Sequence, residues 1–117
     1  MEIIYKNKKI KISVKKVSSF RKITGLMFRS NKTKNLLFEF GKKTKIHIHS
    51  YCVFFDFLAI WLDEKNKVIE WKYVKPFTFH INPKKPFSKL IEIPLNNKNK
   101  EIMKFFVGGK DLNIIKK

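Results

Sequence analysis

Alternation between apolar and polar residues recurs in short stretches of this sequence, and it constrains the fold more than any other feature. Apolar residues stand at positions 10, 12 and 14, at 36, 38 and 40, and at 69, 71 and 73. Successive side chains of a β-strand point to opposite faces, so this alternation predicts strands with one buried face. Such strands along most of the chain predict a mainly β fold, a compact and mostly antiparallel barrel or sandwich.

Helices are expected at two places only. Phe20, Ile23 and Met27 recur at helical spacing after a serine N-cap, which predicts a short helix over residues 18–29. A second short helix is expected over residues 98–106. The other expected elements are a hairpin with its turn at 6–9, a turn at 41–44, a long buried strand at 51–62, a surface connection at 76–86, and strands at 90–94 and 112–115.

The length of 117 residues fits a single domain, residues 1–117, and the 44% of hydrophobic residues support a packed core. Cys52 is the one cysteine, so no intramolecular disulfide can form, and the sequence does not open on an apolar signal segment. These features predict a cytoplasmic protein. The longest apolar run, residues 51–62, contains Asp56 and is shorter than the roughly 20 residues of a spanning helix, so we expect no membrane insertion.

A formal net charge of +18 suggests a polyanionic partner such as nucleic acid. Of the 27 basic residues, however, only Arg21 and Arg29 are arginines, the residue type best suited to bidentate contacts with bases. Lys, Ile, Asn and Phe, which have A/T-rich codons, are abundant, and the lysines are spread over the whole chain. The charge is therefore interpreted in two ways, as a binding surface or as a solvated surface of biased composition.

Five blocks of sequence resemble a known family. They are GLMFR at 25–29, LLFEF at 36–40, IHSY at 48–51, IWLD at 60–63 and LIEIP at 90–94. In their order and spacing these blocks are similar to the domain of unknown function 192 family, also called uncharacterised protein family 0127, over about residues 18–114. The resemblance implies a small, β-rich, barrel-like domain with a short helix. It carries over no established activity.

Asp56 is the most informative single residue, because a carboxylate inside an apolar run must be paired, hydrogen-bonded or exposed. The family usually has a basic residue, Pro, an apolar residue and Asp in this block, and this chain departs from that pattern. One hypothesis places Asp56 in a ligand pocket with Arg29 and His49 as neighbours. The alternatives are a structural ion pair or the solvent side of a strand for Asp56, and a helix C-terminal position for Arg29.

Metal binding and catalysis receive little support from the sequence. His47 and His49 share one face of an expected strand, and Cys52 and His80 are the other candidate ligands. Cys52 has the opposite parity to His49, so a regular strand separates them, and we predict no metal site. The sequence contains no P-loop, G-x-S-x-G, G-x-G-x-x-G or Cys-x-x-Cys motif. We therefore expect a protein without a cofactor and without catalytic residues.

Aromatic residues between lysines form a candidate nucleic-acid surface, since aromatic rings stack on bases and lysines neutralise phosphates. The sequence predicts this surface at Lys75, Phe77, Phe79, Lys84 and Lys85. Trp61, Trp71 and Tyr73 are further candidates for the stacking platform, although Trp71 and Tyr73 also fit inward positions. The leading expectation is a non-catalytic binding module for an unidentified small ligand. The alternative is a nucleic-acid or polyanion binder that uses the lysine-rich surface.

Overall fold

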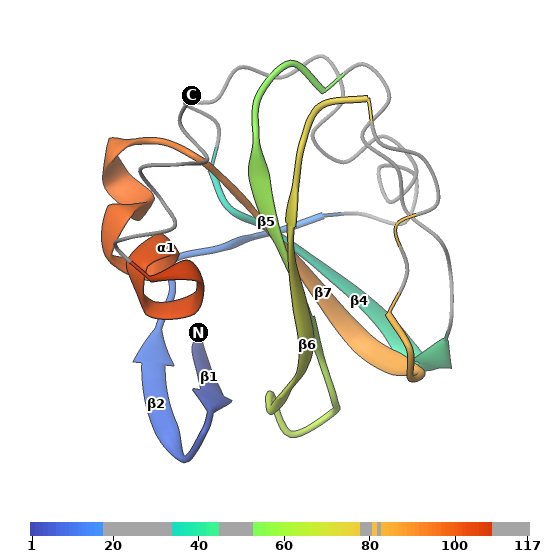
Figure 1. The fold of residues 1–117 in the computed structure, drawn as a ribbon. Helices are drawn as coiled ribbons and strands as arrows, with labels where there is room; N and C mark the ends of the chain where they lie inside the picture. Colours follow the sequence, from blue (N-terminus) through green and yellow to red (C-terminus); the bar gives the residue numbers. More distant parts are fainter. Residues whose placement is uncertain (18–33, 45–52, 78–80, 82, 109–117) are drawn as a thin grey trace.

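The structure, a computed structural model, describes residues 1–17, 34–44, 53–77, 81 and 83–108. Within these residues the chain forms a two-stranded sheet, a five-stranded sheet and one helical segment (Figure 1). The elements are β1 (Glu2–Tyr5), β2 (Lys8–Lys11), β3 (Lys15–Lys16), β4 (Leu36–Thr44), β5 (Phe57–Leu62), β6 (Val68–Val74), β7 (Phe87–Pro94), the 3-10 helix η2 (Asn97–Asn99) and α1 (Lys100–Val107).

Strands β1 and β2 form the predicted N-terminal hairpin. Tyr5 pairs with Lys8 and Ile3 with Ile10, which leaves Lys6 and Asn7 as a two-residue turn. Both turn residues have positive φ angles, 50° and 64°, as the turn type favoured in tight hairpins requires. The turn is shorter than the predicted 6–9. The hairpin is thus confirmed, but the strand predicted from the alternation at residues 10–14 ends at Lys11, and residues 12–14 lie beyond it.

The five-stranded sheet has the order β3-β4-β7-β5-β6. Strand β7 pairs antiparallel with both β4 and β5, and β5 pairs antiparallel with β6, whereas the short β3 runs parallel to β4. All six residues of β5, FLAIWL, are buried, as expected of a strand with neighbours on both sides and packing on both faces. Among the described strands the sheet runs from β3 to β6 without closing on itself.

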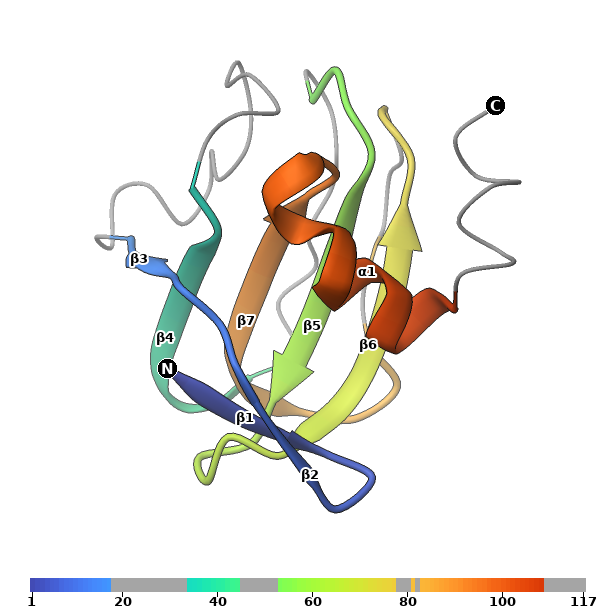
Figure 2. The same ribbon diagram turned by 90° about the vertical axis from the view of Figure 1, so that its left-hand side faces the viewer.

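The two faces of the sheet contribute to two apolar clusters. In β5 the side chains of Phe57 and Trp61 belong to one cluster, and those of Leu58 and Leu62 to the other, because successive residues alternate. Helix α1 lies across the second face, over β5 and β6, and the hairpin covers the lower part of the same face (Figure 2). The buried side chains of the helix, Met103 and Phe106, point into this second cluster.

An aromatic cluster joins the hairpin to the helix and the sheet. The ring of Tyr5 lies 5.8 Å from that of Phe105 and 4.9 Å from that of Phe106. Trp71 of β6 packs edge-on against Phe106 at 5.9 Å, and its Nε1 donates a hydrogen bond of 3.2 Å to the hydroxyl of Tyr5. Such pairs add about 0.5–1.5 kcal/mol each beyond the burial of their area. The helix is therefore held on the sheet by the N-terminal hairpin.

The mainly β fold is confirmed, in a sandwich-like form instead of a closed barrel, with η2 and α1 at the predicted second helix. Two details of the prediction are wrong. Residues 53–56 do not continue β5, which begins at Phe57, and residues 41–44 are not a turn, because β4 extends through them to Thr44. A register shift between Glu39 and Thr44 takes up this irregularity. The helix expected at 18–29 and the strand at 112–115 lie outside the described residues.

Candidate functional site

A pocket of about 600 Å³ opens where the segment after β2, the start of β4 and the η2–α1 segment meet. Its described lining contains four lysines, Lys11, Lys15, Lys34 and Lys98, and a single carboxylate, Glu101. The side chains of Val14 and Ile102 supply apolar surface. The lining thus has a strong excess of positive charge around a volume typical of small-ligand sites, which are about 300–1,000 Å³.

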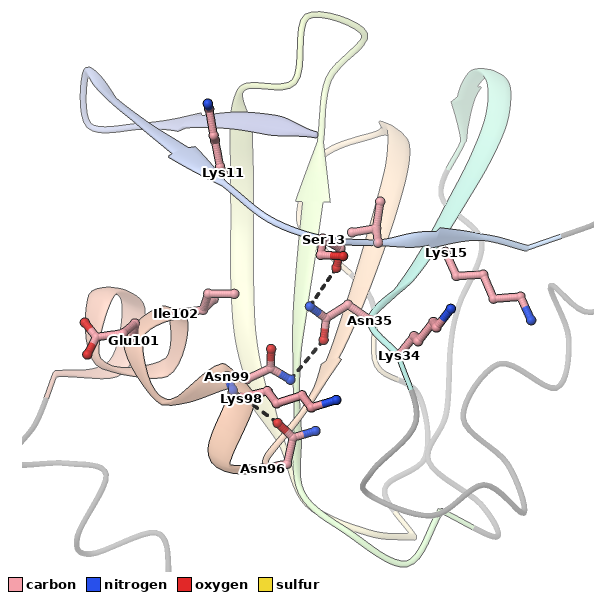
Figure 3. Close-up of a pocket in the computed structure, with 11 residues that line it drawn as sticks. Lys11, Ser13, Lys15, Lys34, Asn35, Asn96, Lys98, Asn99, Glu101 and Ile102 are labelled. Carbon is pink, nitrogen blue, oxygen red and sulfur yellow. Dashed lines mark hydrogen bonds between the residues drawn. The ribbon is translucent and has the colours of Figure 1, made fainter.

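The side chains of three asparagines hold together the segments that form this pocket (Figure 3). Asn99 donates through Nδ2 to Oδ1 of Asn35 at 2.9 Å and to the carbonyl of Pro94 at 2.8 Å. Asn35 in turn donates through Nδ2 to the carbonyl of Ser13 at 2.9 Å. Oδ1 of Asn96 accepts from the backbone N–H of Asn99 at 3.1 Å. These bonds link the segment after β2, the start of β4 and the helical segment into one rigid floor.

Local sequence explains why these asparagines meet. Pro94 ends β7, and Asn96 then caps the 3-10 helix with its side chain, a role for which asparagine is well suited. Asn35 stands one residue before β4, where its carbonyl accepts from the N–H of Lys15 at 2.7 Å and so starts the parallel pairing of β3 with β4. Asn35 and Asn99 are buried, and each has its amide N–H groups directed at a partner.

The four lysines around this floor are exposed, and Lys11 points away from the other three. Lys15, Lys34 and Lys98 extend toward the same side of the pocket, whereas Glu101 points away at the other end (Figure 3). An ammonium group donates hydrogen bonds and accepts none, and its long stem lets it follow an anion of variable shape. The described lining includes no histidine or cysteine. The arrangement is suited to holding an anion and offers no evident acid–base pair.

Asp56 lies in the segment just before β5, next to the segment that leads into the pocket. The hydroxyl of Tyr73 donates to Oδ2 of Asp56 at 2.6 Å, and the carbonyl of Asp56 accepts from the N–H of Leu95 at 2.9 Å. Burial raises the pKa of the Tyr73 phenol well above its usual value, and the hydrogen bond to the Asp56 carboxylate adds to this rise. Arg29 and His49, the expected neighbours of Asp56, lie outside the described residues.

The sequence indicates Tyr73 only as a candidate for the stacking platform or as an inward-facing residue, and its hydrogen bond to Asp56 was not predicted. The strand register contained the signal. Phe57 pairs with Val74 and Leu58 with Tyr73 in antiparallel register, so Asp56 is a diagonal neighbour of Tyr73 on the same face, within reach of its long side chain. A carboxylate and a phenol placed in this way form a hydrogen bond readily. Leu95, directly before Asn96, connects this pair to the asparagine floor.

The predicted aromatic and lysine surface is divided in the structure. Lys75 and Phe77 are exposed just beyond the end of β6. Lys84 and Lys85 are also exposed, but the backbone N–H of Lys84 bonds to Oε1 of Glu70. Glu70 lies four residues before the end of β6, or about 13 Å at the rise of a strand. The two lysines therefore flank an earlier part of β6 than Phe77 does, and Phe79 lies outside the described residues.

Trp61, another candidate for the stacking platform, is fully buried, so this prediction was wrong. Phe54, which the sequence placed inside a buried strand, is instead 64% exposed and contacts Phe77 with ring centroids 5.5 Å apart. Among the described residues there is no group of three side chains able to hold a metal ion. The predicted candidates His47, His49, Cys52 and His80 are not among them. No helix within the described ranges is long and apolar enough to cross a bilayer.

Comparisons with known proteins agree on the fold. A candidate transcription regulator from Sinorhizobium meliloti 1021 superposes with a TM-score of 0.70 at 15% identity, covering 86% of this chain and 82% of its own. A protein of unknown function from Novosphingobium aromaticivorans DSM 12444 gives 0.70 at 12% identity, covering 86% and 75%. No curated protein matches the sequence. A family model described as an uncharacterized ACR matches residues 3–102, and the chain therefore belongs to the DUF192 family, the domain of unknown function 192.

Proposed function

We propose that this protein is a non-catalytic binding module that holds a small anionic ligand in the lysine-lined pocket. The observation that carries the proposal is the charge of the lining, which contains four lysines and a single carboxylate around about 600 Å³. An anion entering this space exchanges water for several ammonium donors, and charge-assisted hydrogen bonds of this kind are stronger than neutral ones. The opposing Glu101 lies at one end, so it leaves the other end electropositive.

The asparagine floor supports the same proposal. A floor in which buried amides already bond one another loses little conformational freedom when a ligand arrives, and such preorganisation favours affinity. Asp56 is connected to the pocket by its carbonyl, which accepts a hydrogen bond from the N–H of Leu95, the residue before Asn96 of the lining. Arg29 and His49 remain predicted contacts of the ligand, and substitution of each residue tests them.

Calorimetric titration with inorganic phosphate, citrate and a sugar phosphate tests the proposal at low salt. The double variant Lys34→Ala/Lys98→Ala removes two ammonium groups from the same side of the pocket. At about 0.7 kcal/mol for each exposed ammonium contact, we expect a loss of affinity of about tenfold. The matched control is Lys8→Ala/Lys65→Ala, which removes the same charge at exposed positions outside the described lining.

Three results would contradict the proposal. Absence of binding by all three anions at low salt would remove its basis. Equal weakening by the pocket variant and the control variant would show that net charge acts without a site. Turnover of the sugar phosphate, abolished by Asp56→Ala with folding retained, would replace a binding module with an enzyme. Single variants Arg29→Ala and His49→Ala, measured beside these, assign the remaining predicted contacts.

A further inference from the structure

Two phenylalanines form an exposed aromatic pair at one end of the sheet. Phe54 is 64% exposed and Phe77 is 48% exposed, and they are the exposed large hydrophobic residues among those the structure describes. Their rings meet edge to face, with centroids 5.5 Å apart and planes at 76°. Phe54 precedes β5 and Phe77 follows β6, and the pairing of Phe57 with Val74 brings these two strand ends together (Figure 1).

The backbone at Phe77 makes the pair more unusual. Its φ angle is 58°, in the left-handed region that favours glycine and asparagine and is a genuine outlier for a bulky side chain. Phe77 lies in a turn directly after Pro76, and the other described non-glycine residues with positive φ, which are Lys6, Asn7 and Asn66, also lie in turns. Phe77 thus has a backbone conformation that is unfavourable for a bulky residue, and its side chain is about half exposed. Burial in the core does not account for a phenylalanine at this position.

The chemistry around the pair identifies a partner. Lys75 is exposed two residues before Phe77, and the whole chain carries a net charge of +18, so a partner that docks here gains most if it is anionic. Exposed aromatic rings favour a partner with flat aromatic groups of its own. Single-stranded nucleic acid combines both properties, since its bases stack on aromatic side chains while its phosphates meet lysines. A duplex hides its base faces and offers the phosphates alone.

We propose that the Phe54–Phe77 pair is a stacking platform for a base of single-stranded nucleic acid, with Lys75 beside it for a phosphate. This is a site separate from the lysine-lined pocket, and it goes beyond the small-ligand function proposed above. Loss of one stacking side chain is expected to weaken binding by roughly fivefold to a hundredfold. The salt dependence is expected to stay the same, because removal of a ring changes no charge.

The decisive variant is Phe77→Gly, because its effects on folding and on binding have opposite signs. Glycine adopts the left-handed backbone without cost, so the melting temperature is expected to stay the same or rise. Fluorescence anisotropy with a labelled 12-nucleotide single-stranded RNA, at 50 and 200 mM salt, is expected to show the loss of affinity. Asn66→Gly is the matched control, since Asn66 has a φ of 66° and lies in the turn between β5 and β6. It is expected to leave binding unchanged.

Several outcomes would overturn the stacking platform. Wild-type affinity in Phe77→Gly and in Phe54→Ala would show that lysines alone attract the RNA. Equal affinity for the RNA and for a duplex of the same sequence would show that base faces are not read. A marked loss of folded protein in Phe77→Gly would make the ring structural. Self-association that disappears in Phe77→Gly would make a second copy of the chain the occupant. The variant Lys34→Ala/Lys98→Ala is expected to retain RNA binding, which would show that the stacking platform acts independently of the lysine-lined pocket.

Discussion

Replacement of Asn99 by alanine is the most direct test of the asparagine floor. The substitution removes two hydrogen bonds, those from Nδ2 to Oδ1 of Asn35 at 2.9 Å and to the carbonyl of Pro94 at 2.8 Å. Both bonds are buried, and a buried acceptor that loses its donor costs about 1–3 kcal/mol. Since water can enter from the adjacent pocket, the lower part of the summed range applies, and we expect a loss of about 2–4 kcal/mol in the free energy of unfolding.

Urea unfolding followed by tryptophan fluorescence measures this loss. With a denaturant slope of about 2 kcal/mol/M, the midpoint is expected to fall by about 1–2 M. Asn97→Ala is the control, because Asn97 is exposed in the same 3-10 turn and its loss is expected to change stability by less than about 0.5 kcal/mol. A midpoint for Asn99→Ala equal to that of Asn97→Ala would refute the reasoning. Asn35→Ala completes a double-mutant cycle, in which strict additivity would show that the Asn35–Asn99 bond contributes nothing.

Two further predictions concern Tyr73 and Gly108. The raised pKa of Tyr73 means that the folded state retains the phenolic proton. The Tyr73 hydroxyl is therefore expected to contribute about 1–2 kcal/mol to the free energy of unfolding relative to Tyr73→Phe. This contribution is complete below the unfolded pKa of about 10 and decreases as the pH rises above that value. Urea unfolding of both proteins from pH 8 to 10.5 measures this difference, and a constant difference would contradict it. Gly108 ends α1 at φ 91° and ψ 147°, which only glycine adopts easily, so Gly108→Ala is expected to lower stability by about 1–3 kcal/mol in thermal unfolding. An unchanged melting temperature would contradict that prediction.

Alternation of apolar and polar residues predicted the strands that have one buried face. It gave no guidance where apolar residues follow one another without alternating. Residues 53–57 contain three phenylalanines, and composition alone treats them alike. In the structure Phe54 is 64% exposed and Phe57 is fully buried. The difference arises because β5 begins at Phe57, opposite Val74, so that only residues from this point on have neighbours on both sides. Strand pairing therefore decides which of these phenylalanines is buried, and the sequence of residues 53–57 does not show where the pairing begins.

The pocket was not predicted because its parts are distant in sequence and ordinary in type. Asn35 and Asn99 are separated by 64 positions, and each alone indicates a loop or a cap. The lysines around them are no different from the lysines elsewhere on a chain with 27 basic residues. Parallel pairing of the short β3 with β4 brings these segments together, and two-residue strands leave almost no periodic signal. Asp56, in contrast, was singled out as a carboxylate that must be paired, hydrogen-bonded or exposed, and the structure gives it a hydrogen bond from Tyr73.

The central place of β7 has a consequence for the protein during its synthesis. Strand β4 has β3 and β7 as its neighbours, so its main antiparallel partner follows about fifty residues later, as the pairing of Leu36 with Glu92 shows. While the ribosome is still adding residues 45–86, β5 and β6 can form their local hairpin, but among the described strands β4 then has only the short β3 as a partner. Contacts of such long sequence separation form slowly. The apolar residues of β4 and β5 are therefore expected to stay open to association with other chains until β7 emerges.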